Sequence, residues 1–162
     1  MEVDDFVARF AGIYEHSPWV AERVAALATG VDDVEQLAAL MADCVDNAST
    51  EQQLALIRAH PDLAGRAQVA GELTAESTVE QTSAGLDRCT SDEFERFQSL
   101  NTAYWEKFGF PFVMAVRGSD RAEILDTFAA RLQNDYDLEF ETALIEIHKI
   151  ARLRLDAMGA NE

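Results

Sequence analysis

The chain has 162 residues, 48% of them hydrophobic, and its 13 basic and 30 acidic side chains give a formal net charge of −17. This length fits one compact domain that buries roughly two-thirds of its unfolded surface. The negative charge disfavours nucleic acid and anionic membranes as partners, since no basic cluster offsets it. No apolar run approaches the ~20 residues that cross a bilayer, and the first residues lack a secretory signal, so a soluble, cytoplasmic protein is expected.

Helical periodicity runs through the N-terminal part of the chain. Phe6, Phe10 and Ile13 mark a first helix. The pair Ser17-Pro18 is typical of an N-cap followed by proline at the first helical position, and Gly30 should end the helix that it opens. Apolar residues three and four apart then predict helices over 34–45 and from Thr50 to about residue 60.

Capping signals predict the helices of the C-terminal half. Thr90-x-x-Glu93 is a capping box for a long helix that ends at Gly109, and Asp120-x-x-Glu123 caps the next. A final helix should begin near Leu138. The stretch 110–116 alone resembles an extended segment, and it is too short to argue a sheet. The sequence therefore predicts an all-α fold, a single-domain multi-helix bundle over residues 1–162.

Residues 56–86 combine groups that a buried helix face does not need. His60 stands before Pro61, which should stop its helix, and a loop of small residues leads to Ser77-x-x-Glu80-Gln81. An imidazole that exchanges a proton near neutral pH, a carboxylate and an amide are the ingredients of a small-molecule site. The alternative is structural: His60 complements a helix C-terminus, and Ser77 with Glu80 forms a capping box.

The two cysteines and three histidines show no spacing typical of metal ligands. Cys44 and Cys89 lie far apart without a Cys-x-x-Cys pattern, so neither a disulfide framework nor a zinc site is expected. Cys44 falls in an apolar helical stripe and is expected to be a small core residue. His148 should lie on the polar side of the last helix. The predicted site therefore contains no metal.

Three motifs resemble those of one family, the 2-oxo-4-hydroxy-4-carboxy-5-ureidoimidazoline (OHCU) decarboxylases. They are His60-Pro61-Asp62-Leu63-Ala64-Gly65, Ser77-x-x-Glu80-Gln81 and Phe108-Gly109-Phe110-Pro111-Phe112, and the likeness extends from Glu15-His16-Ser17-Pro18-Trp19 to Arg154. The resemblance implies an all-α homodimer, a carboxy-lyase of urate breakdown that converts OHCU to S-allantoin and carbon dioxide. It also implies that no metal or organic cofactor takes part.

The same resemblance implies the site residues. His60 and Glu80 would be catalytic, and the substrate would be bound by Pro61, Ser77, Gln81, Phe112, Val116 and Arg154. The family pattern of an apolar-arginine-apolar triplet selects Arg154 over Arg152, and a guanidinium fork suits a carboxylate or ureido group. Arg117 is a further candidate for a ligand contact, whereas His16 fits a packing or subunit-contact role.

Two other functions are compatible with these residues. One is a different cofactor-free lyase or hydrolase acting on a related ureido heterocycle, which turnover of substrate analogues would distinguish. The other is a non-enzymatic acidic helical interaction module, in which His60 and Glu80 serve only as helix caps. The interaction module predicts that an isosteric change at His60 has no effect on function.

Overall fold

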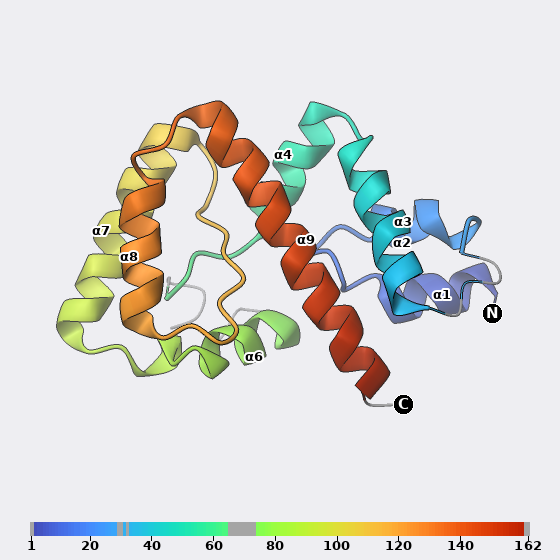
Figure 1. The fold of residues 1–162 in the computed structure, drawn as a ribbon, viewed down its shortest axis with the longest axis horizontal. Coiled ribbons are helices and arrows are strands. Elements are labelled where there is room, and N and C mark those ends of the chain that lie inside the picture. The colour runs from blue at the N-terminus through green and yellow to red at the C-terminus, as the bar shows by residue number, and fades with distance from the viewer. Residues whose placement is uncertain (1, 29–30, 32, 65–73, 161–162) are drawn as a thin grey trace. The chain divides into compact units, whose positions relative to one another are not determined.

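The computed structural model describes residues 2–28, 31, 33–64 and 74–160 (Figure 1). Helices form the regular structure of these residues, and no strand occurs among them, which confirms the predicted all-α fold. Residues 111–116, within the segment predicted to be extended, belong to neither helix nor strand. Over the same described ranges, no helix has both the length and the apolar character needed to cross a membrane.

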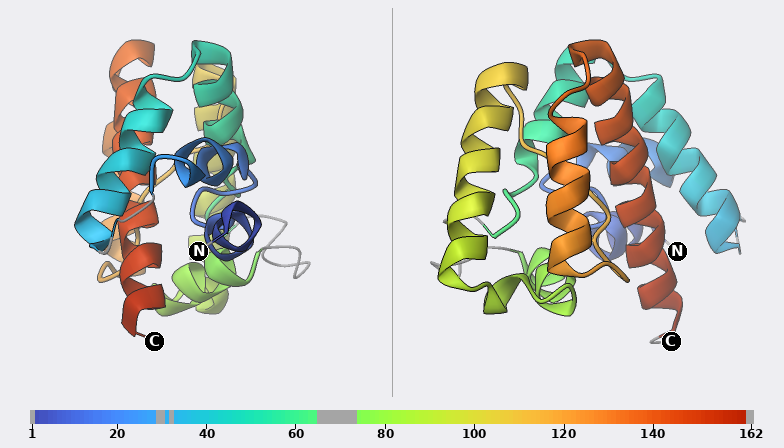
Figure 2. Two further views of the ribbon diagram at one scale, coloured as in Figure 1. Left: turned by 90° about the vertical axis from the view of Figure 1, so that its right-hand side faces the viewer. Right: turned by 60° about the vertical axis from the view of Figure 1, so that its left-hand side comes forward.

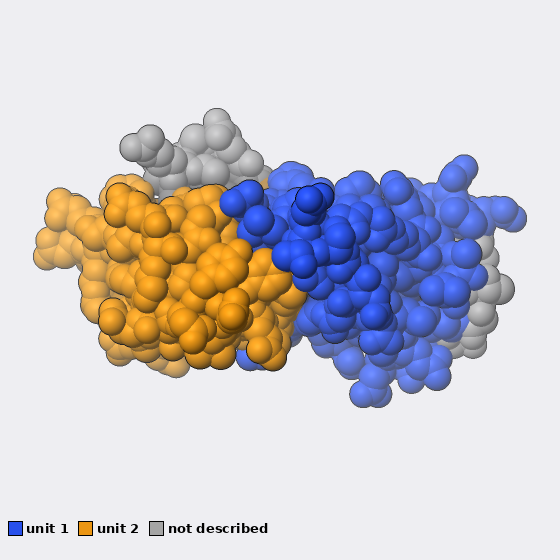
Figure 3. Space-filling model, turned by 90° about the horizontal axis from the view of Figure 1, so that it is seen from above, with its two compact units in different colours: residues 1–59, 147–162 blue, residues 60–146 orange. Residues whose placement is uncertain are grey.

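The chain divides into two compact units, coloured separately in Figure 3. Unit 1 comprises Met1–Ala59 and Ile147–Glu162, and unit 2 comprises His60–Glu146. The last helix, α9 (Tyr136–Ala160), contributes its first part to unit 2 and its second part to unit 1. It begins two residues before the predicted Leu138. That residues 1–162 form a single domain stays a prediction.

Unit 1 gathers the N-terminal helices. They are α1 (Val3–Phe10), α2 (Trp19–Ala25), α3 (Val34–Asp46) and α4 (Thr50–Ala59). Helix α1 packs against α2, and α2 against α3. The buried apolar residues recur at helical spacing, as in Leu37, Met41 and Val45 of α3, and confirm the predicted periodicity. Helix α4 begins at Thr50 and stops before Pro61, as predicted.

The predicted ends of the first two helices are partly wrong. Helix α1 ends at Phe10, and Ile13 is buried in the loop that follows. Ser17 does not cap α2, because its hydroxyl donates to the backbone carbonyl of Glu15 at 2.9 Å. Pro18 occupies the N-cap position without a side-chain bond. The predicted stop at Gly30 lies outside the described residues.

Unit 2 contains α6 (Ala75–Ser83), the short 3-10 helix η1 (Leu86–Arg88), α7 (Ser91–Phe108) and α8 (Arg121–Arg131). Helices α7 and α8 pack side by side (Figure 2). The predicted capping box of Thr90 and Glu93 is present, and Gly109 ends α7 in the left-handed region with φ 73°. Asp120 caps α8 by accepting from the N–H of Glu123 at 2.8 Å, also as predicted.

Aromatic rings fill the centre of unit 2. Tyr104 contacts four other rings, those of Phe108, Phe110, Phe112 and Phe128. Its hydroxyl donates to the buried carboxylate of Glu139 at 2.6 Å, and Arg131 donates to the same oxygen at 2.8 Å. A buried carboxylate needs such partners, because desolvation without them strongly disfavours the charged form. The core of unit 2 is therefore an aromatic cluster built around an ion pair.

Candidate active site

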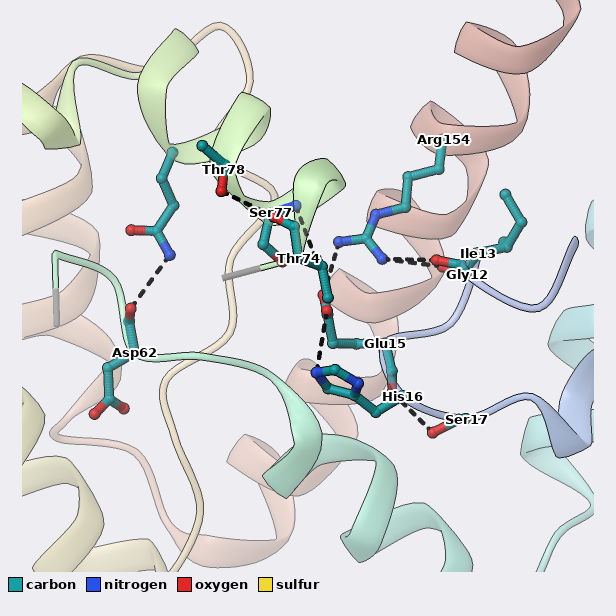
Figure 4. A network of polar contacts seen from close by, with 11 residues as sticks. Gly12, Ile13, Glu15, His16, Ser17, Asp62, Thr74, Ser77, Thr78 and Arg154 are labelled. Carbon is teal, nitrogen blue, oxygen red and sulfur yellow. Dashed lines mark hydrogen bonds and ion pairs between the residues drawn. The ribbon is translucent and has the colours of Figure 1, made fainter. Parts of the chain in front are cut away.

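The N-terminus of α6 differs from the prediction. Thr74, not Ser77, is the N-cap, and its hydroxyl accepts from the Ser77 N–H at 3.2 Å (Figure 4). Ser77 is thus the third helical residue, and Glu80 lies a turn further on. The capping box of Ser77 with Glu80 is wrong, since it would need Ser77 at the N-cap and Glu80 at the third helical position. Capping therefore does not explain why a carboxylate stands at position 80.

One face of α6 carries the three polar residues of the second motif. Ser77, Glu80 and Gln81 are three and four residues apart, a spacing that places them on the same side of a helix. Ser77 and Gln81 are buried, at 4% and 3% exposure, and Glu80 is half-buried. Val79, on another side of the helix, is 67% exposed. The polar face of α6 is thus turned into the protein and its apolar valine outward, the reverse of an ordinary surface helix.

Gln81 connects this face to the histidine motif. Its Oε1 accepts from the backbone N–H of Ala64 at 3.0 Å, and its Nε2 donates to the carbonyl of Asp62 at 3.2 Å. His60, only 7% exposed, directly follows α4 and precedes these residues. The structure therefore brings the segment that follows His60 against the helix that carries Glu80.

Helix α7 holds the same segment from a second side through residues that the sequence analysis missed. Each of three side chains donates one hydrogen bond: Gln98 to the Ala64 carbonyl at 2.8 Å, Asn101 to the Leu63 carbonyl at 3.1 Å, and Trp105 to Asp62 Oδ1 at 3.0 Å. Asn101 could have been noticed, because it falls in the helical stripe formed by Phe97, Tyr104 and Phe108. A polar residue within an apolar stripe indicates a specific buried partner.

Asp62 is a carboxylate in a partly desolvated position. Burial raises the pKa of its carboxyl group, and the hydrogen bond from Trp105 partly opposes this effect. Desolvation disfavours the charged form of an acid, whereas a donated hydrogen bond favours it. Asp62 thus accepts two hydrogen bonds, one at its backbone carbonyl from Gln81 and one at its carboxylate from Trp105.

The segment predicted to line the pocket is fixed by two other helices. Arg131 of α8 donates to the Val113 carbonyl at 2.6 Å, and the N–H of Ala115 donates to Glu146 of α9 at 3.2 Å. The ring of Phe112 stacks on Phe128 with centroids 3.9 Å apart. Because the ring of Phe112 is part of the core, any substrate contact at this position falls to its backbone.

The remaining residues predicted near this segment differ in exposure. Val116, a predicted substrate contact, is buried at 4% exposure. Pro61 is half-buried, and Arg117 is exposed. A buried valine and a half-buried proline suit the wall of a small-molecule site better than an exposed arginine does. Arg117 therefore gains no support from its position.

Arg154, the cation predicted to bind the substrate, lies in unit 1. Its guanidinium donates to the carbonyls of Gly12 and Ile13, at 3.1 and 3.4 Å, and pairs with the Glu15 carboxylate at 2.9 Å (Figure 4). The Arg154 side chain is 5% exposed, whereas that of Arg152 is 43% exposed and pairs with Asp156 on the same helix. Burial thus separates the two arginines in the way that the sequence pattern suggested. Substrate binding by Arg154 stays a prediction.

His148 has partners that its sequence spacing did not reveal. Its Nδ1 lies 2.9 Å from the Tyr14 hydroxyl, and its Nε2 lies 2.9 Å from Asp46 Oδ1. Because a carboxylate only accepts, the Nε2 atom carries the proton, and a neutral ring then accepts from Tyr14 at Nδ1. Burial raises the pKa of the Tyr14 phenol, so that its hydroxyl remains the donor. His16, by contrast, is 66% exposed, which speaks against a packing role within this chain.

The titratable side chains form no evident metal site. Over the described ranges, no three His, Cys, Asp or Glu side chains gather as ligands. Cys44 and Cys89 are free thiols. Partial burial raises the pKa of the Cys44 thiol, so the protonated form is favoured. Cys44 is half-buried rather than part of the core, so its predicted role as a core residue is wrong.

Comparison with known proteins indicates one family. A model of the OHCU decarboxylase family matches residues 1–156, so this chain belongs to that family. It is 46% identical over 162 residues to a 2-oxo-4-hydroxy-4-carboxy-5-ureidoimidazoline decarboxylase of Haloferax volcanii, covering 100% of this chain and 94% of the relative. A protein of the same description from Mus musculus is 42% identical, with 99% and 90% covered.

A solved structure shares the fold. The crystal structure of (S)-allantoin synthase matches with a TM-score of 0.78 and 35% sequence identity. The match covers 97% of this chain and 50% of that one. The family match over residues 1–156 spans the His60 motif as well as Arg154.

Proposed function

We propose that this protein is a carboxy-lyase that converts OHCU to (S)-allantoin and carbon dioxide, a step in the breakdown of urate. Membership of the OHCU decarboxylase family supports the reaction. The observation that carries the proposal for the site is the pair of hydrogen bonds from Gln81, which joins the segment after His60 to the face of α6 that bears Glu80. An imidazole and a carboxylate supported in this way can exchange protons with a bound ligand.

The reaction needs little beyond proton transfer and positioning. The bond between the ring carbon and its carboxylate breaks, and the electron pair moves into the adjoining imine-like ring system, so no cofactor is required as an electron sink. A proton then goes to the carbon that bears the ureido group. His60 hydrogen-bonds the hydroxyl or carboxylate of the same ring carbon and acts as the acid–base residue, with Glu80 assisting.

The substrate-binding roles follow from donor capacity. Gln81 Nε2 carries two hydrogens, one of which goes to Asp62, so the second is the one that a substrate would accept. Ser77 lies on the same face of α6. The family resemblance assigns to Arg154 the binding of the carboxylate or the ureido arm, for which the planar fork of a guanidinium is suited. Pro61, Phe112 and Val116 provide apolar walls and backbone, which exclude water from the reacting centre.

A coupled assay tests the reaction directly. OHCU is produced in place from urate with urate oxidase and the hydrolase that follows it, this protein is added, and the ultraviolet decay of OHCU is followed. Circular dichroism measures the handedness of the product, because spontaneous decay gives racemic allantoin. The proposal fails if OHCU decays no faster than in buffer, or if the allantoin is optically silent from the outset. Chelator-treated protein should keep its full rate.

His60→Asn removes the acid–base group while keeping a polar side chain. General acid–base residues contribute roughly 10²–10⁴-fold, so the rate should fall at least about a hundredfold. Circular dichroism of the variant checks that the helices remain. A folded variant within a few-fold of wild type would contradict the role of His60, and it would favour the reading of His60 as a helix cap.

Glu80→Gln keeps the shape of the side chain and removes its charge. Since Glu80 does not occupy a capping position, the melting temperature should change little, whereas the rate should fall sharply. Glu76→Gln is the matched control, because Glu76 is exposed in the first turn of the same helix. Equal rates in the two variants would leave Glu80 without a role in the reaction.

Two further properties are part of the proposal. The family resemblance leads us to infer a homodimer in the cytoplasm. Light scattering on the purified protein measures the mass against the 17.9 kDa of one chain. A mass of one chain across micromolar concentrations would exclude the homodimer and leave the chemistry untouched.

A further inference from the structure

We propose that one face of α7, formed by Gln98, Asn101 and Trp105, is a positioning element that sets the orientation of His60. This inference rests on the proposed function, since it assigns residues that support the acid–base group of that reaction. We call these three residues the donor face. They are three and four positions apart, so they project from one side of the helix. All three offer a neutral N–H donor and no charge.

Each residue of the donor face contacts one residue of the segment 62–64. Successive donors along α7 contact successive residues in the opposite order: Gln98 with Ala64, Asn101 with Leu63, and Trp105 with Asp62. Gln81 of α6 adds two bonds to the same three residues. Both flanks of this short segment are thus fixed by side chains of separate helices.

The constraint reaches His60 through one residue. The ring of Pro61 fixes its own φ angle, so little freedom remains between the held Asp62 and the histidine. On the other side, α4 ends at Ala59. A side chain at position 60 therefore takes its direction from a helix end and from the segment that the donor face holds.

Two features where α7 meets this segment are unfavourable for stability by themselves. Ala64 has φ 51°, a left-handed conformation that costs energy for any residue with a Cβ atom. Asn101 Oδ1 is buried and has no hydrogen-bond partner in the described part of the chain. Local strain and an orphaned acceptor persist where geometry is held for another purpose. The position of His60 is that purpose.

The neutrality of the donors also matters. A lysine or arginine at these positions would add a positive charge to the segment that follows His60, and a positive charge near an imidazole disfavours its protonated form. Amide and indole donors fix the backbone without that effect. The donor face therefore acts on the geometry of His60 and leaves its proton exchange free to follow the substrate.

Gln98→Met and Gln53→Met form a matched pair of variants. Both glutamines are half-buried and donate from Nε2 to backbone carbonyls, Gln53 to Val45 and Asp46 in unit 1. Methionine keeps the length of the side chain and removes the donor. We expect comparable losses of melting temperature, but a fall in kcat of about tenfold or more only for Gln98→Met, with KM changed by less than about threefold, because misplaced groups slow chemistry.

Asn101→Leu is the second variant, close in size to the native side chain. It removes the orphaned Oδ1 and leaves the Leu63 carbonyl without its donor, so the two effects on stability oppose each other. We expect a small change in melting temperature together with a fall in kcat similar to that of Gln98→Met. This variant keeps the test open if Gln98→Met folds poorly.

A spectroscopic readout separates the inference from the reaction. In protein with ¹⁵N-labelled histidine, the His60 signals are identified by their loss in His60→Asn, and we expect their tautomer pattern to change in Gln98→Met and Asn101→Leu but not in Gln53→Met. If kcat in both variants stays within twofold of Gln53→Met, or if the His60 signals do not change, the donor face has no positioning role. A wild type that leaves OHCU untouched would overturn the reaction alone, and the His60 signals would still decide the positioning.

Discussion

Two short loops of this protein solve the same structural problem with different chemistry. Residues 12–17 of unit 1 contain His16 with φ 48°, and residues 60–64 of unit 2 contain Ala64 with φ 51°. Neither residue is glycine, so each loop carries strain of order 1–3 kcal/mol that its surroundings must offset. In both cases side chains from helices bind the loop backbone.

The loops differ in the charge of what holds them. Arg154 and Glu15 form a buried ion pair in the first loop, and His148 and Asp46 extend the contact to Tyr14. The second loop is held by neutral amides and an indole. A buried ion pair depends on both partners, because the loss of one leaves an uncompensated buried charge. Neutral contacts hold a loop without adding a charge to it.

The largest effect is expected from Glu15→Ala. This change leaves Arg154 as a buried charge without its carboxylate, which costs roughly 3–5 kcal/mol. For a protein of this size that loss lowers the melting temperature by roughly 6–20 °C. Glu22→Ala in α2 is the control, because Glu22 is an exposed acid of the same unit. Similar melting temperatures in the two variants would show that the first loop does not depend on its ion pair.

A smaller effect is expected from Thr74→Ala, which tests the support of the second loop. The change removes the N-cap of α6, the helix that carries Gln81, and N-cap losses cost about 1 kcal/mol. Thr78→Ala on the same helix removes only an exposed hydroxyl that donates to the Thr74 carbonyl. Urea denaturation compares the two. If Thr78→Ala is the more destabilised, the assignment of the cap is wrong.

Ala64→Gly and His16→Gly probe the strain itself. Glycine adopts positive φ without a Cβ clash, so each change should stabilise the fold by up to about 1 kcal/mol, less the entropy that glycine adds to the unfolded chain. The rate on OHCU should stay within a few-fold for Ala64→Gly, because the hydrogen bonds rather than the alanine hold the loop. Destabilisation by both changes would mean that the side chains, not the backbone, are what these positions require.

The smallest effect is expected from Asp62→Asn and depends on pH. Burial raises the pKa of Asp62 in the folded protein, so the folded state favours the protonated acid. Its contribution to stability is present below the pKa of the unfolded chain and is lost as pH rises through the folded pKa. The neutral asparagine can still accept from Trp105. The gain in the free energy of unfolding of Asp62→Asn over wild type should therefore be larger at pH 7 than at pH 3. An equal difference at both pH values would contradict this sign.

Glu93 provides the opposite case within the same unit. The Thr90 backbone N–H and Arg121 lower the pKa of its carboxyl, so its contribution is present at neutral pH and is lost as pH falls through the lowered pKa. Glu93→Gln should then be less stable than wild type at pH 7, and the difference in stability should shrink at low pH. Together the two variants distinguish a carboxyl group whose charged form is disfavoured by burial from one whose charged form is favoured by hydrogen-bond partners.

Local signals in the sequence were sufficient for most helices and some caps. The periodicity of α3, the capping box of Thr90 with Glu93 and the stop at Gly109 each depend on residues within one or two turns. The same signals failed at Ser17 and Ser77. Each is a good cap by type, but the path of the chain before the helix decided which residue took the position.

The sequence by itself also determined which residues are candidates for chemistry, because the motifs around His60 and Glu80 are short and continuous. Only the tertiary structure decided what holds them. Gln98, Asn101 and Trp105 are 34, 38 and 43 residues away from their partners, and Arg154 is 139 residues from Glu15. No local propensity encodes such pairs, since a side-chain amide or guanidinium has the same helical preference whether or not a distant carbonyl comes within reach. The fold brings those carbonyls close to the side chains. Whether a polar group finds a hydrogen-bond partner therefore depends on the tertiary structure and not on any short stretch of sequence.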